Sequence, residues 1–568
     1  MINDRIVAEV VAACLQRHGV EVLFSQSLPS AAVLAAEDAG LRQFTYRTEN
    51  AGGAMADGYA RITRKVGVVT AQNGPAATLL VAPLAEALKS SVPVLALVQE
   101  VDRPNTDRNA FQEIDHIALF GGCAKWIRRV TEVSRVEDYI DMAFAAATAG
   151  RPGPAVLLLP ADLLREPASA PSGRRDSLGT FPLDRVAADP ARLEEAGELL
   201  AAARNPLVMA GGGVHLSGAA DALAALQETA HLPVITTVMG KGAVAEDHPL
   251  SLGVGGNVLG RYSPSRYMKP IVEQADVVLL VGTRTAQNGT DSWTMFPKNA
   301  RFIHLDIDAT EIGRNYEALR LVGDAKLTIE ALTERLRGRR TRSKELVQSI
   351  AAALERAANE SAPLLRSDAS PIRPERLMAD MQQVLTPDAI VVADASYSTV
   401  WVACYLKALR TGMRFLTPRG LAGLGWGLPL ALGAKAARPS NPVLCLAGDG
   451  AFGHVWSELE TARRTRTPVV VTVLNNGVLA YQKDAETVKF GRHTAACVFT
   501  PVDHAAIARA CGCRGVSIRK AADYLPALRE ALASNETTVL DVDTDPEAYP
   551  PITLFDEKLD SIRAERKR

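Results

Sequence analysis

The sequence lacks long apolar runs and an excess of charge of either sign. No run approaches the roughly 20 apolar residues that a membrane-spanning helix needs. The 568-residue chain has 63 Lys and Arg against 64 Asp and Glu, a formal charge of −1. This balance gives no support for binding nucleic acids or anionic membranes through net charge. Hydrophobic residues make up 47% of the chain, which is too many for a mainly disordered protein.

Cysteine is scarce and dispersed. Of the seven cysteines, only Cys511 and Cys513 are close in sequence, and a zinc site would need a second pair. An odd, scattered set is typical of a reducing compartment rather than of a disulfide framework. Residues 1–5 also lack the basic start of a secretory signal and lead into no apolar centre. We therefore expect a cytoplasmic protein whose cysteines are small buried side chains.

Short apolar runs recur along the chain, and helical patterns follow them. The runs are continuous rather than alternating, which is the pattern of parallel strands covered by helices on both faces. They lie at residues 66–70, 94–98, 155–159, 207–210, 277–282, 302–306, 390–393, 443–447, 469–474 and 539–542. The sequence therefore predicts an α/β fold with doubly wound, mainly parallel sheets.

Two segments have the composition of linkers. Residues 165–185 are rich in Pro, Ser, Gly and Arg, and residues 337–373 are charged and Ala-rich before an end interrupted by Ser and Pro. The second segment has room for a surface helix. These cuts leave blocks of ordinary domain size. We predict three domains, at residues 1–165, 186–336 and 374–550, and a charged tail at 551–568, of which residues 558–568 are expected to be solvated.

A Gly-Asp-Gly turn and a double Asn follow two consecutive predicted strands. Gly448-Asp449-Gly450-Ala451 ends one strand, and Asn475-Asn476-Gly477 ends the next, with room for one helix between them. The two side chains should therefore emerge together at the carboxyl edge of a parallel sheet. One carboxylate, one amide oxygen and a turn carbonyl suit Mg²⁺, which keeps positions for phosphate oxygens. The spacing predicts a metal–diphosphate site, and two unrelated turns are the alternative.

This pattern resembles the signature of thiamine diphosphate-dependent enzymes, which begins Gly-Asp-Gly and ends Asn-Asn. The resemblance implies that Asp449 and Asn476 bind Mg²⁺ through their side chains and Val478 through its carbonyl. An upstream turn after the strand at 390–393 lies where family members hold the diphosphate, and its serines have helix capping as an alternative role. The other residues implied at the diphosphate are Ser396, Ser398, Gly448, Gly450 and Ala451.

A second resemblance lies near the N-terminus. Arg47-Thr48-Glu49 precedes a stretch of small residues that ends Gly58-Tyr59-Ala60-Arg61, and family members carry an Arg-His-Glu or similar triplet at this place. From the residues alone, Glu49 could be a first-turn acid favoured by the helix dipole. The resemblance implies instead that the Glu49 carboxylate binds the pyrimidine ring of the cofactor and activates it.

The resemblance covers essentially the whole chain and is closest to the acetolactate synthase-like decarboxylases and carboligases. It implies that Asn73 contacts the cofactor, that Gln112 lies at the active-site edge, and that Leu424 supports the bend of the cofactor, with a core leucine as the alternative. In this family, the activating Glu and the metal site of one active site come from different chains. The resemblance therefore implies a homodimer or a dimer of dimers. Further matching elements lie at residues 72–78, 111–113, 150–154, 240–243, 304–308 and 425–429.

The central domain has a glycine-rich turn at residues 210–214, without the full dinucleotide fingerprint. Family members place FAD or another adenine nucleotide against this domain. Residues 285–289 replace the Phe-Asp-Asp-Arg stretch of acetolactate synthases, so the sequence leaves bound FAD open. Side chains where nucleotide contacts are expected are Arg284, His304, Asp306 and Asp308.

Substrate residues match the family less well than cofactor residues. The arginine that binds the acceptor in acetolactate synthases aligns with Asn288, and the tryptophan expected shortly after the double Asn is absent. We predict a decarboxylase and carboligase acting on a 2-oxo acid such as pyruvate. The alternatives are a carbon–carbon lyase of the benzaldehyde lyase or 2-hydroxyacyl-CoA lyase type, and a non-catalytic paralogue. Both substrates and any regulatory subunit stay open.

Several other polar residues have roles that the sequence suggests. Gln26, Ser27 and Gln482 are further candidates near the substrate. His116 is expected to be structural, because it lacks the second His of a catalytic pair. Lys483 is expected to be exposed rather than bound to a carboxylate.

Overall fold

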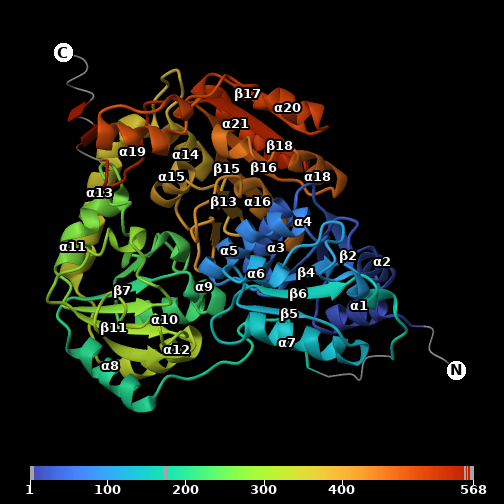
Figure 1. The fold of residues 1–568 in the computed structure, drawn as a ribbon. Helices are drawn as coiled ribbons and strands as arrows, with labels where there is room; N and C mark the ends of the chain where they lie inside the picture. The colour runs from blue at the N-terminus through green and yellow to red at the C-terminus, as the bar shows by residue number, and fades with distance from the viewer. Residues whose placement is uncertain (1–4, 170–175, 556–557, 560, 563–568) are drawn as a thin grey trace.

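The computed structural model describes residues 5–169, 176–555, 558–559 and 561–562. These residues form three domains, each built on a six-stranded parallel sheet with helices packed against it (Figure 1). In Figure 1 the first domain is blue to cyan, the central domain is green, and the third is mainly orange to red. The predicted α/β class with three doubly wound parallel sheets is confirmed.

The first sheet has the strand order β2-β1-β3-β4-β6-β5. Its strands are β1 (Val22–Ser25), β2 (Arg42–Thr45), β3 (Gly67–Ala71), β4 (Val94–Glu100), β5 (Trp126–Arg129) and β6 (Ala155–Pro160). Its helices are α1 (Val7–Arg17), α2 (Ser30–Asp38), α3 (Glu49–Thr63), α4 (Pro75–Leu79), α5 (Val81–Ser90), α6 (His116–Phe120) and α7 (Val136–Thr148).

The central sheet has the order β12-β11-β10-β7-β8-β9, so the direction of winding reverses between β7 and β10. Open parallel sheets bind ligands at such a reversal. The strands are β7 (Pro206–Ala210), β8 (Val234–Thr236), β9 (Ser251–Val254), β10 (Val277–Val281), β11 (Arg301–Asp306) and β12 (Ala318–Val322). The helices are α8 (Pro190–Ala202), α9 (Gly213–Ser217), α10 (Ala220–Thr229), α11 (Lys269–Glu273) and α12 (Ala325–Leu336).

The third sheet has the order β14-β13-β15-β16-β18-β17, the same arrangement as the first, and reverses between β13 and β15. Its strands are β13 (Ile390–Ala393), β14 (Arg414–Leu416), β15 (Val443–Gly448), β16 (Val470–Asn475), β17 (Arg514–Ile518) and β18 (Thr538–Asp543). The helices are α13 (Lys344–Leu365), α14 (Pro374–Gln382), α15 (Tyr397–Tyr405), α16 (Gly427–Ala437), α17 (Asp449–Phe452), α18 (Glu458–Arg464), α19 (Ala480–Phe490), α20 (His504–Ala510) and α21 (Ala521–Ala533).

Every predicted apolar run forms a strand. The strands that the sequence did not predict are mostly edge strands such as β2, β5, β12 and β17, whose residues are largely half-buried or exposed. An edge strand has one neighbour and more contact with solvent, so it needs no continuous apolar run. The three sheets lie within the three predicted domain segments, and the exact limits of those segments stay a prediction.

The second predicted linker contains α13, which is a surface helix as the sequence allowed. Part of the first linker, residues 170–175, lies outside the described residues. Of the tail that we expected to be solvated, residues 560 and 563–568 lie outside the described residues, whereas Leu559 within it is buried. Ile552, Phe555 and Leu559 are each 1% exposed and pack in the apolar core of the third domain. Burial of these three apolar side chains is favourable enough to hold this part of the chain against the core despite the charged residues around them.

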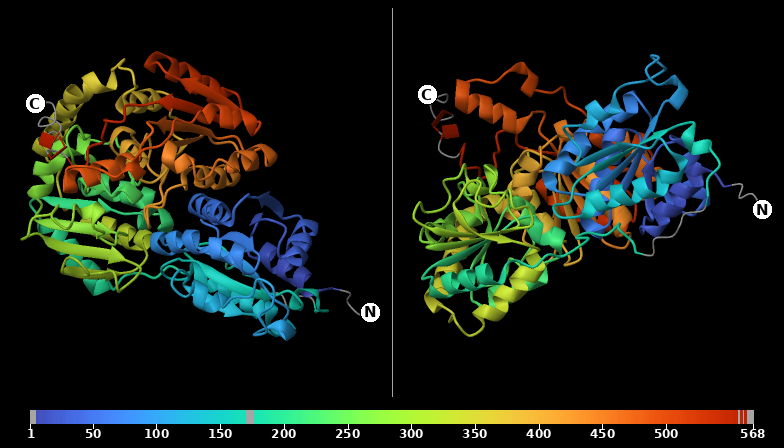
Figure 2. Two further views of the ribbon diagram at one scale, coloured as in Figure 1. Left: turned by 45° about the horizontal axis from the view of Figure 1, so that its top comes forward. Right: turned by 60° about the horizontal axis from the view of Figure 1, so that its bottom comes forward.

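Helices α3 and α16 join the first and third domains (Figure 2). Their backbones approach so closely that a Cβ on Gly433 would lie 2.0 Å from the Met55 carbonyl oxygen, and one on Gly58 would lie 2.5 Å from the Leu430 carbonyl oxygen. Only glycine fits at these two crossings. The small residues of α3 therefore serve packing between domains.

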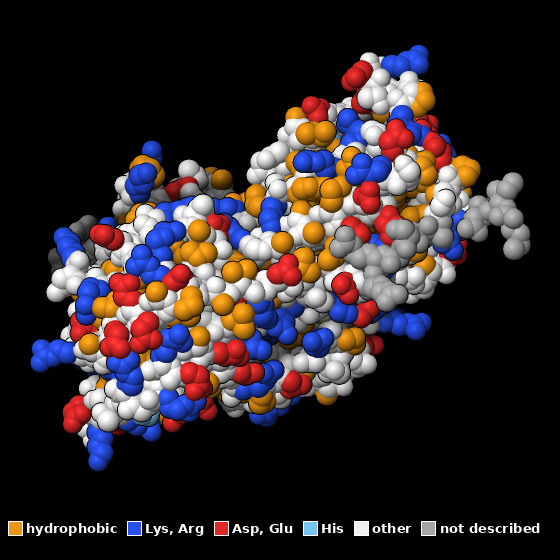
Figure 3. Space-filling model, turned by 90° about the horizontal axis from the view of Figure 1, so that it is seen from below, with side chains coloured by type: hydrophobic (Ala, Val, Ile, Leu, Met, Phe, Trp, Pro, Cys, Tyr) orange, Lys and Arg blue, Asp and Glu red, His pale blue; other side chains and the backbone are white. Residues whose placement is uncertain are grey.

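The surface seen in Figure 3 has basic and acidic side chains interspersed, which fits the near-zero formal charge. Among the described residues, no helix is long and apolar enough to cross a membrane. The seven cysteines are all free thiols, and five of them are buried. The prediction of small buried side chains is thus confirmed for most of them.

Candidate active site

The Gly-Asp-Gly turn and the double Asn meet as the sequence predicted. Asp449 follows β15 directly and begins the one-turn helix α17, while Asn476 follows β16. One Asp449 oxygen accepts a hydrogen bond from the Gly450 N–H at 2.8 Å, and the other accepts from the Gly477 N–H at 2.7 Å. The second bond joins the two loops. Parallel pairing of β15 with β16 brings both turns to the same edge of the sheet.

These turns border a cavity of about 440 Å³ at the carboxyl ends of β13, β15 and β16, which we call the C-terminal cavity. Asp449, Asn476 and Val478 all line it. The Asn476 side-chain oxygen accepts a hydrogen bond from the Val478 N–H at 3.1 Å, which fixes the turn. A carboxylate, an amide oxygen and a backbone carbonyl thus lie on one wall, and this donor set suits Mg²⁺.

Burial raises the pKa of Asp449 to about 6, because the carboxylate is only 7% exposed. The nearby Asp541 raises this pKa further, whereas the N–H groups of Gly450 and Gly477 lower it. No basic side chain pairs with Asp449 among the described residues. A divalent cation at this position would stabilise the ionised form, so the electrostatics fit a metal ligand.

Two serines face the same cavity from the turn after β13. Ser396 has a positive φ of 68° and precedes α15, but its side chain makes no capping hydrogen bond. The alternative role of helix cap is therefore not adopted by Ser396. Ser398 lies in the first turn of α15 and is 3% exposed. Both line the cavity, beside Gly448, Gly450 and Ala451.

Asp394, at the end of β13, is a residue that the sequence reasoning did not assign. Its fully buried carboxylate accepts hydrogen bonds from the N–H groups of Gly427 at 2.6 Å, Ala395 at 2.7 Å and Gly425 at 3.2 Å. Burial raises its pKa to about 6, against the effect of these donors. Asp394 therefore ties the loop that carries Leu424 to the strand end, and Leu424 lines the cavity rather than a core.

Glu49 is the first residue of α3, with Thr48 as the capping residue. Glu49 is 9% exposed and lines neither the C-terminal cavity nor the central cavity described below. A fully buried acid of α18, Glu458, holds the preceding turn by accepting hydrogen bonds from the Arg47 N–H at 3.2 Å and the Thr48 N–H at 3.1 Å. The third domain thus fixes the start of α3. No local sequence signal marks Glu458.

Asn73 and Gln112 lie together in the first domain, and neither lines the C-terminal cavity. The Asn73 amide donates to the backbone carbonyls of Gln112 at 3.1 Å and Phe111 at 3.3 Å. The Gln112 side-chain oxygen accepts from Gln72 at 2.6 Å, and its nitrogen has no partner among the described residues. Gln112 has a positive φ of 62°. The network therefore fixes a strained turn that presents a free amide donor.

His116 is structural, as expected. It is 2% exposed, accepts the Gly74 N–H at 3.1 Å and contacts Glu100 at 3.2 Å. Lys483 was predicted to be exposed, and that prediction is wrong. It is 9% exposed, donates to the Pro546 carbonyl at 3.0 Å and pairs with Glu547, because α19 places this side chain against the loop that follows β18.

Among the weaker candidates, Gln482 is exposed and lines the C-terminal cavity. Gln26 donates to the Arg47 carbonyl at 3.0 Å in the turn before Glu49, and Ser27 is exposed. The structure thus brings Gln482 to the C-terminal cavity, while Gln26 and Ser27 lie in the first domain.

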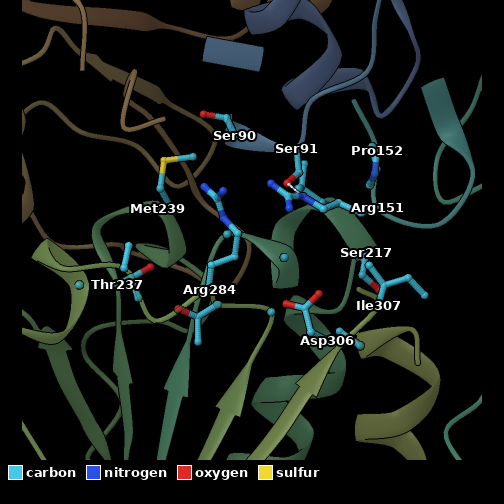
Figure 4. Close-up of a pocket in the computed structure, with 18 of the residues that line it drawn as sticks. Ser90, Ser91, Arg151, Pro152, Ser217, Thr237, Met239, Arg284, Asp306 and Ile307 are labelled. Carbon is cyan, nitrogen blue, oxygen red and sulfur yellow. Dashed lines mark hydrogen bonds between the residues drawn. The ribbon is translucent and has the colours of Figure 1, made fainter. Parts of the chain in front are cut away.

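A second cavity of about 340 Å³ lies at the winding reversal of the central sheet, and we call it the central cavity. Gly212 and Gly213 of the predicted glycine-rich turn line it. Figure 4 shows Arg151 and Arg284 extending into the space between the strand ends and the first domain, opposite Asp306. Burial raises the pKa of Asp306 to about 6.

Two residues expected at this cavity do not line it. His304 is 1% exposed and bonds to the Thr283 carbonyl at 2.8 Å, inside the sheet. Asp308 is directed to Arg151 at 3.4 Å and to Thr310. The position of His304 along β11 explains this, because it shares a face with Asp306 but lies two residues before the carboxyl end of the strand.

Residues 5–119, 193–332 and 394–542 match three models described as thiamine pyrophosphate enzyme: the N-terminal TPP binding domain, the central domain and the C-terminal TPP binding domain. The matches follow the order of the three sheets. Each of the three domains therefore matches the corresponding domain of thiamine pyrophosphate enzymes.

Individual relatives cover nearly the whole chain. A probable acetolactate synthase large subunit of Methanococcus aeolicus is 31% identical over 98% of this chain and 95% of its own length. One from Methanocaldococcus jannaschii is 32% identical over 96% and 93%. The acetolactate synthase isozyme 2 large subunit of Escherichia coli is 30% identical over 95% of both. The chain therefore belongs to the thiamine diphosphate-dependent enzymes of the acetolactate synthase large-subunit family.

Proposed function

We propose that the protein is a Mg²⁺- and thiamine diphosphate-dependent enzyme that decarboxylates a 2-oxo acid such as pyruvate and transfers the remaining acyl unit to a second 2-oxo acid. The observation that carries the proposal is the convergence of Asp449, Asn476 and Val478 on one wall of the C-terminal cavity. The relatives named above are acetolactate synthases by name. Their names do not favour a carbon–carbon lyase, and lyase activity is therefore an alternative outcome of the assay.

The metal ligands are proposed to be the Asp449 carboxylate, the Asn476 amide oxygen and the Val478 carbonyl. Ser396 and Ser398 would donate hydrogen bonds to phosphate oxygens from the facing turn. The bare backbone of Gly448 and Gly450 and the small side chain of Ala451 would allow close approach of the anion. Thiamine diphosphate, when bound, supplies the nucleophilic carbon that attacks the oxo carbon and holds the electrons released with CO₂.

Glu49 is proposed to hold a proton at the pyrimidine ring nitrogen through its carboxylate. Leu424 would support the bent cofactor, and Asn73 would contact the cofactor while holding the turn at Gln112. The unpartnered nitrogen of Gln112 is proposed to donate a hydrogen bond at the substrate, which orients it.

A homodimer, or a dimer of dimers, is proposed to complete each site. Within one chain Glu49 does not line the C-terminal cavity. Large apolar side chains are exposed near both halves of the site: Phe111 is 84% exposed, Leu421 55% and Phe499 37%. Exposed apolar surface of this kind favours association.

FAD or another adenine nucleotide is proposed as a ligand of the central cavity. The cavity lies at the winding reversal of its sheet, where dinucleotides bind in such folds. Gly212 and Gly213 permit close approach of a phosphate, and Arg284 supplies positive charge. The absorption spectrum of the purified protein tests for flavin directly. A cytoplasmic location is also proposed, on the basis of free, mostly buried cysteines.

The test of the proposed function is production of CO₂ and acetolactate from pyruvate, with and without Mg²⁺ and thiamine diphosphate. We expect product only with both. Glu49→Gln should lower kcat by roughly 100-fold or more while cofactor binding persists, and Glu37→Gln, an exposed acid on α2, should not change the rate. Absence of cofactor binding by calorimetry, or of CO₂ from a panel of 2-oxo acids, would overturn the proposal. Aldehyde release from a 2-hydroxy ketone or a 2-hydroxyacyl-CoA would favour the lyase.

A further inference from the structure

The central and C-terminal cavities share two wall residues, Asn288 and Arg419. Asn288 comes from the loop after β10 in the central domain, and Arg419 comes from the loop between β14 and α16 in the third domain. The two cavities therefore meet at a polar boundary made by two domains. Acetolactate synthases are expected to carry an arginine at position 288. Here that residue is the neutral Asn288, so the positive charge at this boundary comes from Arg419 on a different loop.

The loop that carries Arg419 is held rigidly by the first domain. The Glu86 carboxylate, which is 1% exposed, accepts hydrogen bonds from the Gly420 N–H at 2.7 Å and the Leu421 N–H at 2.6 Å. Glu86 also accepts from the Ser90 hydroxyl at 2.7 Å and lies 3.7 Å from Arg61. The negative charge of Glu86 is therefore already compensated by these donors.

The Arg419 guanidinium forms no hydrogen bond and no ion pair with any described residue. Burial lowers its pKa, and the opposing effects of Tyr481 and Glu86 are smaller. Arg419 is half-buried, so its guanidinium loses part of its water without gaining a partner, which is costly. A cation held in this way is suited to receive an anionic ligand.

Arg419 is also the only Lys, Arg or His among the described residues that line the C-terminal cavity. The cavity has two carboxylates. Asp545 pairs with Arg373 at 3.0 Å, and Asp449 accepts from two backbone N–H groups as described above. Asn257, on the same wall, has a buried side-chain oxygen without a partner. The wall thus offers a cation and an unused polar atom to a small molecule.

We infer that Arg419 binds the carboxylate of the 2-oxo acid substrate, an inference that rests on the proposed function and names its specificity residue. The planar guanidinium matches a carboxylate with two parallel hydrogen bonds. Asn288 and Asn257 flank the substrate at the boundary. The central cavity has its own arginines, Arg151 and Arg284, whereas the C-terminal cavity depends on Arg419 alone. This difference favours a substrate carboxylate over a nucleotide phosphate as the ligand of Arg419.

Steady-state kinetics of Arg419→Gln and Arg419→Lys test this inference. Gln removes the charge and should raise KM for pyruvate by about 100-fold with a smaller change in kcat, while Lys should restore part of the affinity. Rates with methyl pyruvate, which lacks the carboxylate, should change less than threefold. Arg410→Gln, an exposed arginine before β14, is the matched control and should behave as wild type. Equal KM values for pyruvate in Arg419→Gln and wild type would overturn the inference.

Two further measurements separate this inference from the proposed function. Pyruvate binding is measured by saturation-transfer NMR on protein without thiamine diphosphate, so that turnover is not required. Binding that Arg419→Gln abolishes supports the inference even if no 2-oxo acid is turned over, whereas turnover with unchanged KM refutes the inference alone. Lack of both pyruvate binding and turnover in the wild type refutes both. Weaker FAD binding by Arg419→Gln with unchanged KM would assign Arg419 to the central cavity and refute the inference.

Discussion

Removal of the Glu458 carboxylate should loosen the start of α3 and with it the position of Glu49. In Glu458→Ala, the N–H groups of Arg47 and Thr48 lose their acceptor in a buried place. Each unsatisfied buried donor costs about 1–3 kcal/mol, so the turn should lose roughly 3 kcal/mol of stability. That loss corresponds to about 100-fold faster local opening, because 1.4 kcal/mol is tenfold.

Hydrogen exchange measured by mass spectrometry reads this opening directly. The peptide over residues 45–52 should exchange about 100-fold faster in Glu458→Ala than in the wild type, and kcat/KM should fall by roughly 10- to 100-fold because Glu49 is displaced. Glu458→Gln should cost about 1 kcal/mol or less. Its oxygen keeps the Thr48 bond, and the Thr461 hydroxyl can turn to accept from its nitrogen. Since burial raises the pKa of Glu458, a neutral side chain is also tolerated there.

Arg463→Gln is the matched control, because Arg463 lies on the same helix, is exposed, and forms no hydrogen bond or ion pair with residues 45–52 in the described structure. It should change the exchange of residues 45–52 by less than twofold. Unchanged exchange and full activity in Glu458→Ala would refute the reasoning that the third domain fixes the start of α3.

Three other predictions follow from the same structure. Mixing Glu49→Gln with Asp449→Asn chains, each inactive alone, should restore about a quarter of wild-type activity, because half the dimers are mixed and carry one intact site of two; no recovery after verified subunit exchange would contradict sites shared between chains. Gly433→Ala should destabilise the protein by about 1–3 kcal/mol in thermal unfolding, because its Cβ would overlap the Met55 carbonyl, and Gly122→Ala, with open space around it, should not. Burial raises the pKa of Asp306 to about 6, above its ordinary value, so the stability linked to this carboxyl is present at low pH and lost as pH rises through 6. Asp306→Asn should therefore become more stable relative to wild type between about pH 5 and 7, and parallel melting curves across that range would count against this account.

Much of the fold followed from local patterns. Continuous apolar runs marked the strands that are buried on both faces, because such strands have no polar side to interrupt the run. The edge strands β2, β5, β12 and β17 could not be found in this way, since contact with solvent leaves their sequences mixed. The burial of Ile552, Phe555 and Leu559 was also missed, because three spaced apolar residues among charges carry no strong period.

The sequence by itself determined that the Gly-Asp-Gly turn and the double Asn meet at one edge of the third sheet, because a turn after a buried strand in a parallel sheet has a fixed place at the carboxyl edge. Asp449 and Asn476 are placed together in this way. Only the tertiary structure decided that Glu458 fixes the turn before Glu49, that Lys483 is buried, and that Arg419 stands unpaired between two cavities. Each of these depends on which distant side chains reach the same buried space, and the free energy of a buried charge is set by those neighbours rather than by adjacent residues.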